Sequence, residues 1–104
     1  MKRYAVYCTG LQPDMGICQL TSTFENSVAA WQIYGIANPR LVAYTNGSIV
    51  FKEDFKADTI QDLEQATSDM IDALQSYWPK IGEAVYLVDS LRPSYSYMAF
   101  VRIG

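Results

Sequence analysis

The chain has 104 residues, of which 50% are hydrophobic and 18% charged, with a formal net charge of −3 and a pI near 4.7. This length predicts a single domain over residues 1–104, and the hydrophobic fraction is atypical of a disordered chain. The acidic balance argues against direct binding of nucleic acid, because such proteins neutralise phosphates with positive charge. The sequence contains no histidine, which excludes histidine-based catalytic triads and histidine metal ligands.

The apolar run that follows Lys2 and Arg3 is shorter than a secretory signal, and no run approaches the ~18 apolar residues of a membrane-spanning helix. We therefore expect a soluble, cytoplasmic protein without a membrane partner. The two cysteines, Cys8 and Cys18, would approach each other if residues 3–9 paired with residues 16–21. Their small number instead favours two reduced, partly buried thiols, and their redox state is left open.

The first part of the chain is predicted to form two strands joined by a turn. Residues 2–9 are rich in strand-forming side chains and end at a glycine, and residues 10–15 contain glycine, proline and aspartate, which favour turns. Residues 16–21 are a second, weaker candidate strand, and the sequence leaves open whether they form a strand or not.

A helix is predicted next, over residues 23–36. Ser22 and Glu25 have the spacing of a capping box, in which each side chain bonds the backbone N–H of the other residue. The residues that recur at helical spacing are Phe24, Val28, Trp31 and either Tyr34 or Gly35. The helix should end before Asn38, because a residue that precedes proline disfavours helical geometry.

The segment around Asn46-Gly47 carries the strongest local signal. This dipeptide between two strand-like runs predicts a two-residue hairpin turn of type I′, in which both central residues take positive φ. The facing pairs would be Tyr44 with Ile49, Val42 with Phe51 and Arg40 with Glu53. We expect the face formed by Val42, Tyr44, Ile49 and Phe51 to be buried.

Residues Asp58 to Tyr77 are predicted to form a second helix, with Asp58 as its N-cap and Gln61 at the capping-box position. Its apolar stripe at spacings of three and four is expected to bury Leu63, Met70 and Leu74. Two further strands follow at residues 84–89 and 95–103.

Two topologies fit this order of elements, and both are α+β. One is ββαββαββ, and the other is a ferredoxin-like βαββαβ arrangement with an additional C-terminal strand. Each predicts a single antiparallel sheet with two helices packed on one face.

Charge is unevenly distributed along the chain. Residues 53–72 contain seven of the eleven acids and one base, Lys56, which gives this window a charge of −6 and the rest of the chain +3. On a helix, Asp58, Asp62, Asp69 and Asp72 would fall within a sector of roughly 80°. No lysine or arginine lies between residues 58 and 78, so these acids have no cation on their own helix.

These acids allow two interpretations: a solvated face that keeps the protein dispersed, or a ridge that docks on a basic surface. A metal site is disfavoured, because Asp62 and Asp69 are two helical turns apart and no EF-hand spacing is present. We expect no cofactor and no metal.

We therefore predict a small acidic, non-enzymatic protein-binding module that occludes a larger basic protein or a nucleic-acid-binding complex. Inhibitors, immunity proteins and anti-defence proteins of phages or mobile elements share this size and charge. The predicted contact residues are Asp58, Asp62, Asp69, Asp72, Glu53 and Asp54. The alternative is a small-molecule-binding or catalytic domain with a tyrosine-lined pocket, whose candidate residues are Tyr4, Tyr86, Tyr95 and Tyr97.

Overall fold

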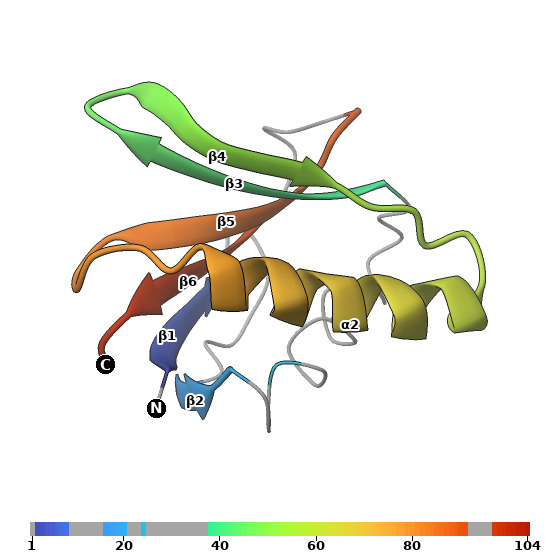
Figure 1. Ribbon diagram of the computed structural model, residues 1–104, viewed down its shortest axis with the longest axis horizontal. Helices are drawn as coiled ribbons and strands as arrows, with labels where there is room; N and C mark the ends of the chain where they lie inside the picture. The colour runs from blue at the N-terminus through green and yellow to red at the C-terminus, as the bar shows by residue number, and fades with distance from the viewer. Residues whose placement is uncertain (1, 9–15, 21–23, 25–37, 92–96) are drawn as a thin grey trace.

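The structure, a computed structural model, describes residues 2–8, 16–20, 24, 38–91 and 97–104. The described strands form one antiparallel sheet in the order β2-β1-β6-β5-β3-β4, and the helix α2 (Ile60–Ser76) crosses one face of it (Figure 1). The strands are β1 (Arg3–Cys8), β2 (Gly16–Gln19), β3 (Pro39–Thr45), β4 (Ser48–Asp54), β5 (Ala84–Asp89) and β6 (Tyr97–Arg102).

The predicted fold class, two helices packed on one face of the sheet, is wrong. The described part of the chain contains one helix, α2, on a single antiparallel sheet, and it is mostly sheet. The helix predicted over residues 23–36 lies outside the described residues, apart from the helical and buried residue Phe24.

The ferredoxin-like topology is also wrong. It would place β1 beside the second strand of the Asn-Gly hairpin, but that strand, β4, lies at an edge of the described sheet. The reason is that residues 16–19 do form a strand, β2, which pairs with one side of β1 while β6 pairs with the other.

The hairpin turn is confirmed. Asn46 and Gly47 both take positive φ, 52° and 81°, as a type I′ turn requires. The predicted pairing holds next to the turn, where Tyr44 lies opposite Ile49. Beyond it the register shifts by one residue, so that Phe51 lies opposite Ala43.

This bulge divides the predicted buried face: Val42, Tyr44 and Ile49 stay on one side of the sheet, whereas Phe51 lies on the other side, partly buried against the core. Tyr44 and Ile49 are 46% and 55% exposed. The core between sheet and helix instead receives Leu41 and Ala43. Val42 is buried too, but alternation places it on the sheet face away from α2.

The second helix begins one residue later than predicted. Thr59, not Asp58, is its N-cap, and the Thr59 hydroxyl accepts a hydrogen bond of 3.0 Å from the Asp62 backbone N–H. Met70 and Leu74 are fully buried as expected, whereas Leu63 is only partly buried. The helix ends where Lys2 donates to the carbonyl oxygens of Leu74 and Gln75, which ties its last turn to the start of β1.

Candidate functional site

Acidic residues from β4 and α2 meet at one end of the molecule. The chain leaves the edge strand β4 at Asp54 and turns back to begin α2, which runs beneath the same end of the sheet (Figure 1). A cavity of about 280 Å³ lies between the two segments. The residues lining it are Asp54, Phe55, Lys56, Asp62, Gln65, Ala66 and Asp69.

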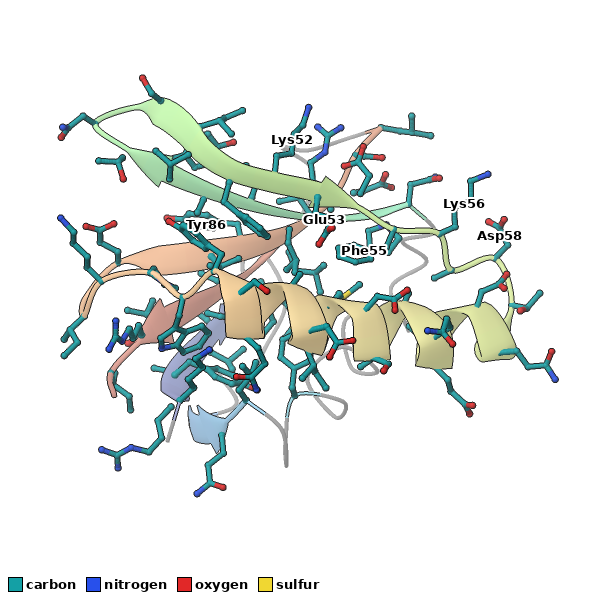
Figure 2. All side chains as sticks on the ribbon, viewed as in Figure 1. Lys52, Glu53, Phe55, Lys56, Asp58 and Tyr86 are labelled. Carbon is teal, nitrogen blue, oxygen red and sulfur yellow. The ribbon has the colours of Figure 1, made fainter. Side chains whose placement is uncertain are left out.

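Three of the six predicted contact residues, Asp54, Asp62 and Asp69, therefore share this cavity. Glu53, Asp58 and Asp72 are exposed and do not line it. Asp58 precedes the N-cap and is not part of the helix, so the predicted four-aspartate helical sector is wrong in that respect. Figure 2 shows Asp58 beside Lys56 near the first turn of α2.

The three cavity carboxylates have different surroundings. Asp54 accepts two hydrogen bonds from the guanidinium of Arg40, its Oδ2 lying 3.0 Å from Nη2. This hydrogen-bonded pairing lowers the pKa of Asp54 and raises the pKa of Arg40. The predicted partner of Arg40, Glu53, lies opposite Leu41 instead, because of the register shift.

The other two carboxylates belong to α2. Asp69 accepts a hydrogen bond of 3.0 Å from the Gln65 amide one turn earlier, which fixes the orientation of its carboxylate. Within the part of the chain that the structure describes, no side chain hydrogen-bonds to or ion-pairs with the half-buried Asp62 carboxylate. Asp62 is thus the cavity carboxylate still open to a partner from outside.

Basic residues gather at the opposite end of α2, where both chain ends lie (Figure 1). Four of the seven described bases are there: Lys2, Arg3, Lys80 and Arg102. Arg102 donates to the Pro79 carbonyl oxygen at 2.7 Å, and Lys2 also lies over the Trp78 ring. The segregation of charge along the sequence therefore corresponds to a separation in space.

The tyrosines of the alternative pocket do not come together among the described residues. Tyr4 is fully buried and makes edge contacts with the rings of Phe24, Trp78 and Phe100. Tyr86 lies on the other face of the sheet, since it falls between the core residues Val85 and Leu87, and it contacts Tyr44.

The remaining two tyrosines give no further support to that pocket. Tyr95 lies outside the described residues, and Tyr97, which pairs with Val88, has a side chain that is not described.

The strand register separates the two cysteines. Cys18 lies opposite Tyr4, four residues along β1 from Cys8, which corresponds to about 13 Å. A disulfide needs Cα atoms less than ~7 Å apart, so these two residues do not form one.

The described residues include no group of three cysteines or acids placed to hold a metal ion. The helix α2, the one helix of the described residues, is not long and apolar enough to cross a membrane.

Comparison with protein-family models, with curated proteins and with solved structures finds no significant match for this chain. The interpretation of the site therefore depends on the geometry of this chain alone. Sequence reasoning missed the apolar wall of the cavity, formed by Phe55 and Ala66, and the pairing of Asp54 with Arg40. One local signal pointed to the cavity. Gln65 and Asp69 have the i,i+4 spacing of a side-chain hydrogen bond on a helix, which places these two lining residues on the same side of α2.

Proposed function

We propose that this protein is a non-enzymatic binding module that docks a basic macromolecule on its acidic surface. The acidic surface comprises Glu53, Asp54, Asp58, Asp62, Asp69 and Asp72. The observation that carries the proposal is the cavity in which Asp54, from the end of β4, meets Asp62 and Asp69 of α2. Separation of these acids from the basic residues at the other end of α2 adds support.

The physical argument concerns association rate. Clustered charges of one sign create a field that orients an oppositely charged partner before contact and accelerates productive encounters. Three described bases lie at the acidic surface: Arg40 neutralises Asp54, and Lys52 and Lys56 are exposed, so the six acids keep a net charge of about −3. Salt screens such a field over about 10 Å at 0.1 M, which makes the effect measurable.

In this proposal the partner is a basic protein or a nucleic-acid-binding complex whose lysines and arginines otherwise hold phosphates. Covering those residues would inhibit the partner, as immunity and anti-defence proteins do. A cytoplasmic location belongs to the same proposal.

The test uses two double variants with the same change in net charge. The partner is first recovered from the native host with the tagged protein, and association rates are then measured at low and high salt. Asp69→Asn/Asp72→Asn should associate about three- to tenfold more slowly at low salt, and the difference should shrink at high salt.

The matched control is Glu64→Gln/Glu83→Gln, which removes two acids that lie outside the acidic surface. It should retain most of the parent's rate. The Asp69→Asn/Asp72→Asn variant should fold as stably as the parent or a few tenths of a kcal/mol more stably, because mutual repulsion is relieved. Equal association rates for the two double variants would refute the proposal.

A further inference from the structure

The cavity at the acidic surface combines carboxylates with apolar walls. Ala66, only 3% exposed, lies on α2 between Asp62 and Asp69, and its short side chain leaves the space that a longer one would fill. Across the cavity is Phe55, which is half-buried and packs against the core. Figure 2 shows Phe55 between the end of β4 and α2.

The volume limits the size of the occupant. Pockets for drug-sized ligands typically span about 300–1,000 Å³, and this cavity, at about 280 Å³, falls just below that range. One long side chain is therefore a better match than a cofactor. Asp62 and Asp69 are seven residues apart, about 10.5 Å along the helix axis, which is too far for both to ligate one metal ion.

The carboxylates favour a planar cation. Arg40 already donates two hydrogen bonds to Asp54 at the edge of this cavity, so a carboxylate here binds a guanidinium in the two-pronged geometry. Asp62 offers a second carboxylate with no described partner. Gln65 holds the Asp69 carboxylate in a fixed orientation, in which it can contact a second group of the partner.

The apolar walls favour arginine over lysine. A guanidinium is weakly hydrated and stacks on aromatic rings, and Phe55 supplies such a ring. The methylene groups of the same side chain would pack on Ala66. An ammonium keeps its hydration more strongly and gains less from these walls.

We infer that this cavity receives an arginine side chain of the partner, with its guanidinium on Asp62 and Phe55. This inference rests on the proposed function, since it names the group that the acidic surface recognises. It gives the surface a point of specificity in addition to its long-range field.

The test uses small probes, so that it does not depend on the partner. Uniformly ¹⁵N-labelled protein is titrated with N-acetyl-L-arginine amide and, at equal ionic strength, with N-acetyl-L-lysine amide. The arginine probe should bind more tightly, and its chemical-shift changes should concentrate at residues 54–56 and 62–69.

Variants then separate the cavity from the general field. Asp62→Asn should weaken binding of the arginine probe about three- to fivefold, whereas Glu64→Gln, on the other flank of α2, should leave it unchanged. Phe55→Leu keeps an apolar wall but should reduce the preference for arginine over lysine. Unchanged amide spectra away from each substitution establish that these variants fold.

Equal affinity for the two probes, or equal weakening by Asp62→Asn and Glu64→Gln, would overturn the cavity site. Salt-dependent association of the Asp69→Asn/Asp72→Asn variant would still support the proposed function in that case. The two failures are therefore distinguishable.

Discussion

Replacement of Gly47 measures how much stability the hairpin turn loses when a residue other than glycine takes positive φ, without a contribution from side-chain crowding. Gly47 has φ +81°, and a Cβ atom built on it meets no other heavy atom within 4 Å. Any loss of stability must therefore come from forcing an L-residue into the left-handed region, which costs about 1–2 kcal/mol. Gly47→Ala should lose about 1 kcal/mol, and Gly47→Val more, because a β-branched side chain is least tolerant of positive φ.

The assay is urea unfolding of the parent and both variants. The midpoint concentration should fall in the order parent, alanine, valine, while the slope of free energy against urea stays constant. Asn46→Gly is the matched control, because its φ of +52° suits glycine and the change should cost little or stabilise. Identical midpoints for the parent and Gly47→Val would refute the assignment of a type I′ turn.

Two further predictions concern the core and the ion pair. Leu74→Ala, at a fully buried position, should lower the free energy of unfolding by about 2–5 kcal/mol, whereas Leu91→Ala, at a position 75% exposed, should change it by less than ~0.5 kcal/mol. Because Arg40 lowers the pKa of Asp54, the pair stabilises the fold above the unfolded pKa of about 4 and loses this contribution as pH falls through the folded pKa. Arg40→Gln should therefore cost about 0.5 kcal/mol at pH 7 and less at pH 2, and an equal cost at both values would contradict the pairing.

The hairpin shows what local sequence can predict. Asn46-Gly47 determines the turn because few other residue pairs accept two positive φ values in succession. The bulge that follows was not predictable, because Ile49, Val50 and Phe51 are three consecutive apolar residues. Such a run has no alternation that would reveal which residue is the extra one.

The exact start of α2 was not predictable from local sequence either. Asp58 and Thr59 are both good N-caps, and the sequence does not decide between them. The buried positions Met70 and Leu74 were predictable from helical spacing, whereas the order of the strands was not, because it depends on which distant strands meet.

The candidate site was predictable in composition but not in shape. Counting acids between residues 53 and 72 identified the charged segment. The cavity exists because the chain turns back after β4 and brings Phe55 against α2, and no short-range pattern specifies that approach. Arg40 joined the site only through the register shift, which placed it opposite Asp54 instead of Glu53.

Among the described strands, β4 has a neighbour on one side only, and this outer edge bears on the proposed recognition of a partner. The Phe55 backbone N–H donates to Pro39 O, so alternation directs the backbone groups of Glu53 toward β3 and those of Lys52 and Asp54 outward. Pairing β4 with a second copy about a two-fold axis at Glu53 would place two glutamates opposite each other, and an axis at Lys52 would do the same with two lysines. Like charges in facing positions destabilise a sheet, but the axis at Glu53 also sets Lys52 opposite Asp54 twice, so charge opposes only the register with the axis at Lys52, and the bulge interrupts the edge nearer the turn. In the proposed function, recognition at this end of the molecule therefore depends on the side chains and charge of the acidic surface and not on an added strand.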